Sequence, residues 1–295
     1  MKPQLDCISI NGLSKSYKNI KALDNVSFTI PIGSIFALLG PNGSGKSTLI
    51  KILARLIRDW KGSILFNGNS INQSNDHLNK FGFIVEDPCF YEYLSAKKNL
   101  EIFSRLTGTS FHQIEKVLEL VDLRHRSDDK VAKYSYGMKQ RLGIAQALLH
   151  DPKILVLDEP TNGLDPLGVN SMADLIFRLN QAGKTICIST HSLIEVDRIC
   201  SHVAILKKGK LLVTKEINLL EEDGEFFRLE VFDLRSAVSF IKTFDELEII
   251  SQENNIIIVK KNISDNSDDF NSMIGDQRSI KSFHKESNLI QYFYD

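Results

Sequence analysis

The stretch IFALLGPNGSGKST, residues 35–48, decides the fold of this 295-residue chain. Its first five residues are apolar, as in a buried strand, and helical texture begins at Ser47 and continues to about Ile57. Between the two, the chain matches the phosphate-binding pattern GxxxxGK[ST] at Gly40, Pro41, Asn42, Gly43, Ser44, Gly45, Lys46, Ser47 and Thr48. The pattern lies between a strand and a helix, as a phosphate-binding loop requires, so we predict such a loop here.

The residue types of this loop predict its ligands. Its glycines let successive backbone N–H groups turn inward around the β- and γ-phosphates of a nucleotide, and the following helix adds its positive end. Lys46 is expected to contact the phosphates, and the hydroxyl of Ser47 is expected to bind Mg²⁺. The alternative is an ordinary glycine-rich turn, which the strand, loop and helix order disfavours.

A phosphate loop also needs an acid for Mg²⁺ at the end of a second strand. The run Ile154–Leu157 supplies four apolar residues that lead directly into Asp158. Glu159 comes next, at the same strand end, where a glutamate could accept the proton of an attacking water. The two acids would otherwise be read as a solvated strand end, which is less plausible beside a phosphate loop.

Together with residues 134–141, YSYGMKQR, these motifs resemble an ABC ATPase over about residues 8–215. The resemblance implies ATP and Mg²⁺ as ligands, ATP hydrolysis as the activity, and Ser47 and Asp158 as Mg²⁺ ligands. The stretch departs from the family signature LSGGQ at three of five places and keeps Ser135 and Gly137. Those two would present a hydroxyl and a backbone N–H to a γ-phosphate at a helix N-terminus.

Three further stretches match the family in order along the chain. Tyr17 is where an aromatic ring stacks on adenine in the family, although it could also be an ordinary half-buried strand tyrosine. Residues 162–165, NGLD, resemble the loop that crosses to a second subunit. His191 resembles the switch histidine that reaches the γ-phosphate, so the resemblance makes Glu159 and His191 the catalytic pair.

One departure from the family concerns the nucleotide site. Most members place a glutamine after the strand at residues 81–85, and this chain has Glu86. A carboxylate there would add negative charge near Mg²⁺ and the attacking water. The surrounding pattern IxExPxFY, residues 84–91, is similar to the ATPases of bacitracin and lantibiotic self-protection exporters. The alternative is a loop that tolerates either residue.

The chain-wide pattern predicts an α/β fold of the P-loop NTPase type, as the resemblance implies. Strands alternate with helices, which indicates a mostly parallel sheet with helices on both faces, joined by an antiparallel N-terminal subdomain and a helical subdomain. Turn signals are read at Asn11-Gly12 and Lys208-Gly209. We predict an ABC ATPase domain over 1–220, a charged linker at 216–225 and a small C-terminal α+β domain over 226–295, with a loop at 264–272.

Composition and resemblance together predict the partners. The 36 basic and 37 acidic residues nearly cancel, so nucleic acid is not expected. The first nine residues have no apolar leader and no run is long enough to span a bilayer, which predicts a cytoplasmic protein. The four cysteines are far apart, with no CxxC pair and no metal-ligand spacing, so we expect them to be small buried apolar residues in a reducing compartment.

The resemblance implies an ATP-dependent dimer, with itself or with a homologous ATPase, attached to the cytoplasmic face of the membrane through a separate transmembrane permease. The alternative is a soluble ABC ATPase that acts on ribosomes or DNA. The single cassette and the lack of sustained heptads favour the transporter subunit.

Overall fold

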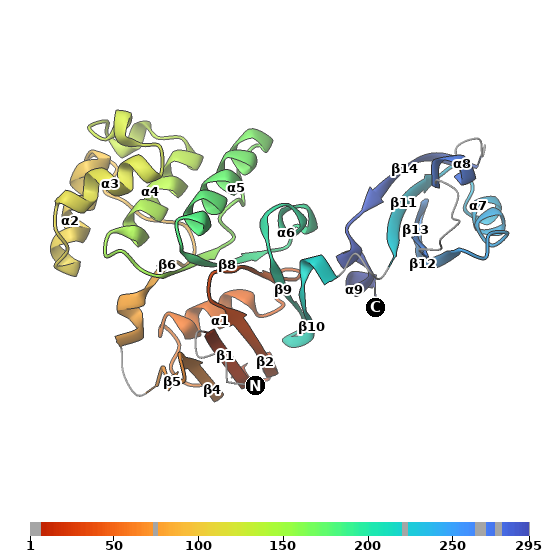
Figure 1. Cartoon of the computed structure of the whole chain (residues 1–295), viewed down its shortest axis with the longest axis horizontal. Helices are drawn as coiled ribbons and strands as arrows, with labels where there is room; N and C mark the ends of the chain where they lie inside the picture. Colours follow the sequence, from red (N-terminus) through yellow and green to blue (C-terminus); the bar gives the residue numbers. More distant parts are fainter. Residues whose placement is uncertain (1–6, 73–75, 220–223, 263–269, 275–278, 295) are drawn as a thin grey trace. The chain divides into compact units, whose positions relative to one another are not determined.

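The computed structural model describes residues 7–294 except 73–75, 220–223, 263–269 and 275–278. The chain divides into two units between Thr214 and Lys215, and each is described by itself (Figure 1).

A six-stranded sheet forms the centre of the first unit, in the order β10-β9-β3-β8-β7-β6. Strands β9, β3, β8, β7 and β6 pair in parallel, and β10 follows β9 through a two-residue turn whose residues, Lys208 and Gly209, both have positive φ. The bounds are β3 Ile35–Leu39, β6 Phe81–Ile84, β7 Ile154–Asp158, β8 Thr185–Thr190, β9 His202–Lys207 and β10 Lys210–Glu216. This confirms the predicted mostly parallel sheet.

An antiparallel sheet of four strands packs on the same unit, in the order β2-β1-β4-β5. Its strands are β1 Cys7–Tyr17, β2 Ile20–Pro31, β4 Lys61–Phe66 and β5 Asn69–Ser70. Its apolar side chains share one core with α1 and with alternate residues of the central sheet, such as Phe36 and Leu38. The intervening Ala37 is also fully buried, because α5 and α6 contact the sheet as well.

Helices α2, α3 and α4 lie together at one end of the first unit in Figure 1, where they pack on one another as the predicted helical subdomain. Helix α4 also contacts β6 of the central sheet, and α1, α5 and α6 contact the same sheet. Their bounds are α1 Lys46–Leu53, α2 Ala96–Thr107, α3 His112–Leu120, α4 Tyr136–Leu148, α5 Pro166–Gln181 and α6 Leu193–Ile199. Short 3₁₀ turns are η1 Asp76–Lys80, η2 Arg124–Arg126 and η3 Val131–Lys133.

Two local predictions in this unit are wrong. The pair Asn11-Gly12 is not a turn, because β1 is paired on both sides and continues through a shift in register at this point. Gly12, with φ +60°, absorbs the bulge. The helix after the phosphate loop ends at Leu53 rather than near Ile57, because Arg55 adopts φ +57°, in which a right-handed helix cannot continue.

The second unit is a split β-α-β with an antiparallel sheet in the order β12-β13-β11-β14. Its elements are β11 Glu225–Val231, α7 Leu234–Ile241, β12 Leu247–Glu253, β13 Ile256–Lys261, α8 Phe270–Ile274, β14 Ile280–Glu286, η5 Asn288–Ile290 and α9 Gln291–Tyr294. Residues of α7 and α8 share one core with a face of the sheet, where the rings of Phe227 and Phe270 stack with centroids 3.7 Å apart.

The predicted linker at 216–225 and the predicted loop at 264–272 can be compared with the structure only in part. Glu216 ends β10 and Glu225 begins β11, and residues 220–223 lie outside the described part. Residues 264–269 of the predicted loop also lie outside it. The prediction is wrong at Phe270, which begins α8 because its buried ring packs on Phe227.

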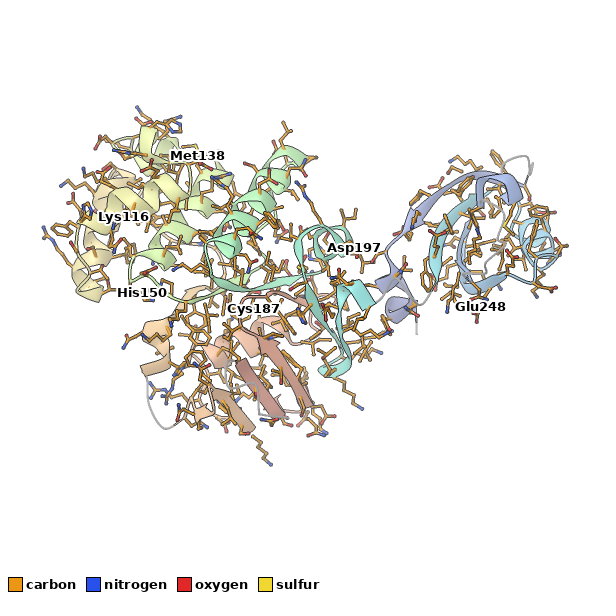
Figure 2. All side chains as sticks on the ribbon, viewed as in Figure 1. Lys116, Met138, His150, Cys187, Asp197 and Glu248 are labelled. Atoms are coloured by element: carbon orange, nitrogen blue, oxygen red, sulfur yellow. The ribbon has the colours of Figure 1, made fainter. Side chains whose placement is uncertain are left out.

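The cysteine prediction is right for two residues and wrong for one. Cys187, labelled in Figure 2, and Cys200 are buried, and burial raises the pKa of both thiols, that of Cys187 to about 12. Cys89 is exposed because it lies in the loop that follows β6. The side chain of Cys7 lies outside the described part.

Candidate nucleotide site

The predicted phosphate loop joins β3 to α1 and is shaped to receive an anion. Gly45 immediately precedes the helix with φ +110°, and a Cβ there would lie 2.5 Å from the backbone oxygen of Ala22, so a side chain does not fit. The hydroxyl of Ser44 is buried and has no hydrogen-bond partner. An unpaired buried hydroxyl and the open N–H groups of a helix start fit nucleotide phosphates.

Lys46 supplies a buried positive charge to this loop. Its side chain is 4% exposed, and its Nζ donates hydrogen bonds to the oxygens of Gly40, at 2.7 Å, and Pro41, at 3.3 Å. The ammonium therefore curls back onto the loop at the place where the pattern predicts phosphate.

The predicted Mg²⁺ ligands lie together. The hydroxyl of Ser47 donates to Asp158 Oδ1 at 3.3 Å, and the same oxygen accepts from Ser189 Oγ at 2.5 Å. Hydroxyl and carboxylate oxygens suit Mg²⁺. In the described part of the chain no group of three or more His, Cys, Asp and Glu side chains could hold a metal.

Glu159 joins the phosphate loop to the predicted switch histidine. Its Oε1 lies 3.6 Å from Lys46 Nζ, and its Oε2 lies 3.4 Å from His191 Nδ1. Glu159 has φ +45°, a conformation that costs about 1–2 kcal/mol and turns the chain sharply at the end of β7. The structure thus brings together five residues that the sequence singled out: Lys46, Ser47, Asp158, Glu159 and His191.

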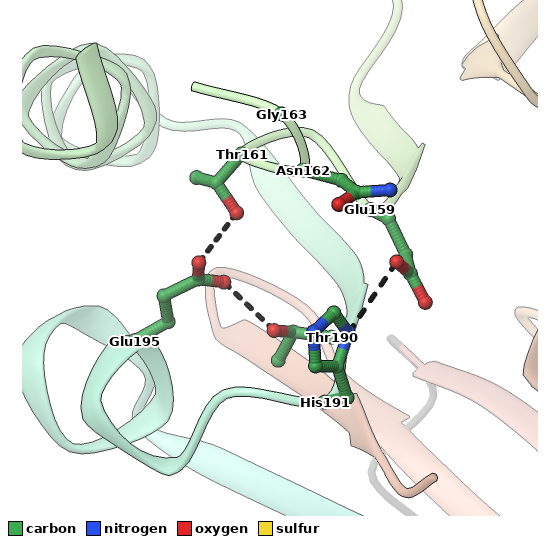
Figure 3. A pocket seen from close by; sticks show the side chains of 7 residues that line it. All are labelled: Glu159, Thr161, Asn162, Gly163, Thr190, His191 and Glu195. Carbon is green, nitrogen blue, oxygen red and sulfur yellow. Dashed lines mark hydrogen bonds and ion pairs between the residues drawn. The ribbon is translucent and has the colours of Figure 1, made fainter. Parts of the chain in front are cut away.

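A pocket of about 140 Å³ opens beside Glu159 and His191 (Figure 3). Glu159 and His191 line one side, and Glu195 of α6 lies on the other. Glu195 accepts hydrogen bonds from Thr161 Oγ1 at 2.5 Å and from Thr190 Oγ1 at 2.8 Å. Glu195 thereby connects Thr190, the residue before His191, with Thr161, the residue before the predicted crossing loop at 162–165.

Sequence reasoning missed Glu195, although one signal was present. Ser192 and Glu195 have the S-x-x-E spacing of a capping box, and Ser192 does cap α6 by accepting from the backbone N–H of Glu195. The Glu195 carboxylate, however, bonds to the two threonines, and the distance along the chain from Thr161 hid that contact.

We expect Glu195→Ala to lower ATP turnover about tenfold and to change nucleotide affinity by less than about twofold, because it removes two hydrogen bonds that position His191 without touching the phosphate loop. Phosphate release and nucleotide titration measure the two effects. Asp174→Ala is the control, since Asp174 also binds α6, through Arg198 at 3.2 Å, away from the pocket. Equal losses in the two variants would contradict a positioning role.

Three predicted site residues have no hydrogen bond to this cluster in the part of the chain that the structure describes. Tyr17 ends β1 and is 45% exposed, and Lys15 Nζ lies 5.1 Å from the centroid of its ring. Ser135 caps the start of α4 by accepting from the backbone N–H of Met138, and Gly137 follows in the first turn. Among the described residues, no hydrogen bond joins Ser135 or Gly137 to the phosphate loop.

Tyr136, one of the departures from the family signature, contacts the loop that also carries the other departure, Glu86. Tyr136, in the signature, donates from its hydroxyl to Asp87 Oδ1 at 2.6 Å, and Gln140 Nε2 donates to the tyrosine oxygen at 2.9 Å. Burial and the hydrogen bond to Asp87 raise the pKa of Tyr136. Its ring also lies against Gly163. The signature helix, the crossing loop and the loop after β6 therefore meet at one tyrosine.

Glu86 is not an isolated carboxylate. Its Oε1 accepts a hydrogen bond from Lys51 Nζ of α1 at 2.6 Å. The sequence predicted added negative charge at this point, and the structure pairs that charge with an ammonium which sequence reasoning did not single out.

Comparison with known proteins places the chain in a family. A sequence model of the ABC transporter family matches residues 23–162. An uncharacterized ABC transporter ATP-binding protein of Bacillus subtilis, YhcH, is 43% identical over 76% of this chain and 75% of its own length. The chain is an ABC transporter ATP-binding protein. As a member of the family it is an ABC transporter ATPase.

Relatives with named transport roles are nearly as similar. The lantibiotic transport ATP-binding protein SrtF of Streptococcus pyogenes is 40% identical over 76% of this chain and 97% of its own length. The bacitracin transport ATP-binding protein BcrA of Bacillus licheniformis is 41% identical over 78% of this chain and 77% of its own length. This confirms the predicted resemblance to the bacitracin and lantibiotic ATPases.

Solved structures agree with the fold of this ABC ATPase. The ADP conformation of MJ1267, an ATP-binding cassette of an ABC transporter, superposes with a TM-score of 0.67 at 25% identity, covering 72% of this chain and 91% of that one. The cbiO1 subunit from Clostridium perfringens gives 0.67 at 28% identity, covering 73% and 90%. In the described part of this chain, no helix is both long and apolar enough to cross a membrane.

Proposed function

We propose that this chain hydrolyses Mg·ATP as half of a two-fold dimer and energises a separate membrane permease, which exports a peptide antibiotic or a similar amphipathic cargo. The observation that carries the catalytic part is the position of Glu159, next to the proposed metal ligand Asp158 and within 3.6 Å of Lys46 and 3.4 Å of His191. A carboxylate so placed can accept a proton from water at the phosphate end of the site.

Different residues of the chain would bind the phosphates, the metal ion and the base of the nucleotide. The phosphate loop and Lys46 hold the phosphates, Ser47 and Asp158 would hold Mg²⁺, and Tyr17 offers its exposed ring to the base. Mg²⁺, when bound, would neutralise charge on the phosphate oxygens. His191 and Lys46 hold the Glu159 carboxylate beside the place of reaction, and Glu195 keeps His191 in position.

The position of the signature supports the dimer. Ser135 is exposed at the start of α4, and Gly137 follows in the first turn, so the hydroxyl and the backbone N–H groups of this helix start are accessible to a partner. Neither bonds to the phosphate loop of its own chain in the part that the structure describes. A second copy, or a homologous ATPase, would receive them at its own γ-phosphate, which makes two composite sites related by two-fold symmetry.

The named relatives support the transport role. ABC ATP-binding subunits work with a permease, so attachment of this chain to the cytoplasmic face of the membrane would come from that partner. The bacitracin and lantibiotic proteins support a peptide antibiotic as cargo, and the pattern at residues 84–91, which has glutamate at position 86, is consistent with that group.

Affinity purification from its own cell tests this proposal. We expect the tagged Glu159→Gln chain, taken from gently solubilised membranes, to bring down one polytopic membrane protein in stoichiometric amount, with an untagged strain as control. Deletion of the chain should then sensitise the cell to bacitracin or a lantibiotic, and only the wild-type chain should restore resistance. Recovery of ribosomal proteins or DNA-repair factors, with no membrane protein, would favour the soluble alternative.

A further inference from the structure

Helix α1 holds two glutamates through two lysines. Lys46, at its first position, lies 3.6 Å from the carboxylate of Glu159, and Lys51 lies 2.6 Å from the carboxylate of Glu86. The second contact is the shorter of the two and is a direct hydrogen bond. Each lysine of this helix therefore has a carboxylate partner.

The two glutamates occupy equivalent places on neighbouring strands. Strands β6 and β7 pair in parallel with Ile84 opposite Leu157, and each glutamate comes two residues after that pair. Both glutamates also have positive φ, +66° at Glu86 and +45° at Glu159. The strand ends therefore turn in the same unusual way at the carboxyl edge of the sheet, where ligands bind in such folds.

Lys51 lies on the same face of α1 as Ser47, one of the proposed Mg²⁺ ligands, because it comes four residues later in the helix. Ser47 in turn is bonded to Asp158. The pKa of Lys51 is raised, first by its hydrogen bond to Glu86 and further by the negative charges of Glu86 and Asp158, with Tyr17 contributing. Its ammonium thus lies in the combined field of both carboxylates.

The Lys51 and Glu86 pair is easily broken. The two side chains are 32% and 69% exposed, and an ion pair in that setting is worth at most about 1 kcal/mol. Such a pair contributes little to folding, yet it neutralises a carboxylate at the edge of the phosphate site. Loss of the pair should therefore change the affinity for ligands more than the free energy of unfolding.

We propose that Lys51 is a positioning residue that sets the Mg²⁺ dependence of nucleotide binding, because its ammonium competes with Mg²⁺ for the negative potential of Glu86 and Asp158. The inference rests on the proposed Mg·ATP site. Without Lys51, the bare carboxylate of Glu86 would repel metal-free nucleotide more strongly than the Mg²⁺ complex, which carries less negative charge. With Lys51 present, the two forms of the nucleotide differ less in affinity.

A double-mutant cycle tests this competition. The probe is a fluorescent, non-hydrolysable ATP analogue, and the measured quantity is the ratio of its dissociation constant in EDTA to that in Mg²⁺. We expect Lys51→Met to raise this ratio about three- to fivefold and Glu86→Gln to lower it. In the Glu86→Gln background only the smaller effect of Asp158 remains, so Lys51→Met should change the ratio by no more than about twofold.

Two control variants separate the pair from folding and from general charge effects. Lys51→Arg keeps the positive charge and should leave the ratio near the wild-type value. Lys285→Met removes a lysine bound to Glu225 at 2.7 Å in the second unit and should also leave it unchanged. Thermal melting of each variant shows whether it is folded.

The possible results distinguish this inference from the function on which it rests. The proposed role of Lys51 is overturned if Lys51→Met changes the ratio of dissociation constants by the same factor in the wild-type and Glu86→Gln backgrounds, or changes it in neither. A folded wild-type chain that fails to bind the analogue in Mg²⁺ overturns the proposed site, and this inference with it.

Discussion

Replacement of Glu159 by glutamine should reduce ATP turnover by about 10²–10⁴-fold, the range for loss of a general base, while Mg·ATP still binds. The amide has the size of the carboxylate, so the contacts with Lys46 and His191 can keep their geometry. It cannot accept a proton from water. Phosphate release at saturating nucleotide gives the turnover, and a titration with the fluorescent ATP analogue gives the affinity.

Glu230→Gln is the matched control for this variant. Glu230 is also a glutamate paired with a lysine, Lys281 at 3.2 Å, but it lies in the second unit. We expect its turnover to stay within about twofold of wild type, as is usual for surface substitutions. If Glu159→Gln also stayed within that range, the general base would have to be another residue.

Lys46→Ala should weaken binding of Mg·ATP about a hundredfold. The ammonium is almost fully buried and donates two hydrogen bonds inside the loop, so the loop itself fixes its position. Hydrogen bonds to charged groups contribute about 1.5–3 kcal/mol, and 1.4 kcal/mol corresponds to tenfold in affinity. Loss of Lys46 also leaves the Glu159 carboxylate without its counter-ion near the phosphates. Calorimetric titration measures the change.

Lys46→Met separates charge from packing in this prediction. Methionine fills much of the space of the lysine stem but carries no charge, so we expect it to bind nucleotide as poorly as Lys46→Ala. Unaltered affinity in a folded Lys46→Ala chain would refute the assignment of this loop to phosphate binding.

The sequence predicted the parts of the fold that depend on short-range patterns. The strand, loop and helix at residues 35–48 were recognisable because five apolar residues, a glycine-rich loop and a helical run follow one another. The hairpin at Lys208-Gly209 was recognisable from its turn residues. The same type of signal was misleading at Asn11-Gly12, because pairing of β1 on both sides overrides a local preference for a turn.

The second unit shows where local patterns fail. Strand β14 and helix α8 were not predicted from the sequence. Their side chains are mixed in polarity, and their positions are fixed by contacts with β11. Phe270 is buried against Phe227 from a segment that reads as polar. Such long-range packing leaves no period in the sequence.

The candidate site divides in a similar way. Lys46, Ser47, Asp158, Glu159 and His191 were identified from motif order, and the structure brings them together. Lys51 and Glu195 were not, because each acts on a residue far away in the chain, Glu86 and Thr161. An exposed ion pair and a threonine contact have no sequence signature, so only the fold reveals them.

The mass of the Glu159→Gln chain in solution, measured by light scattering with and without Mg·ATP, tests the composite-site account most directly. The account predicts one chain mass without nucleotide and twice that mass in saturating Mg·ATP, because each bound nucleotide would then join a phosphate loop to a partner's signature. Substitution of the signature, Ser135→Arg, should abolish the doubling while ATP still binds. A single chain mass in Mg·ATP, under conditions where titration shows that nucleotide is bound, would contradict it.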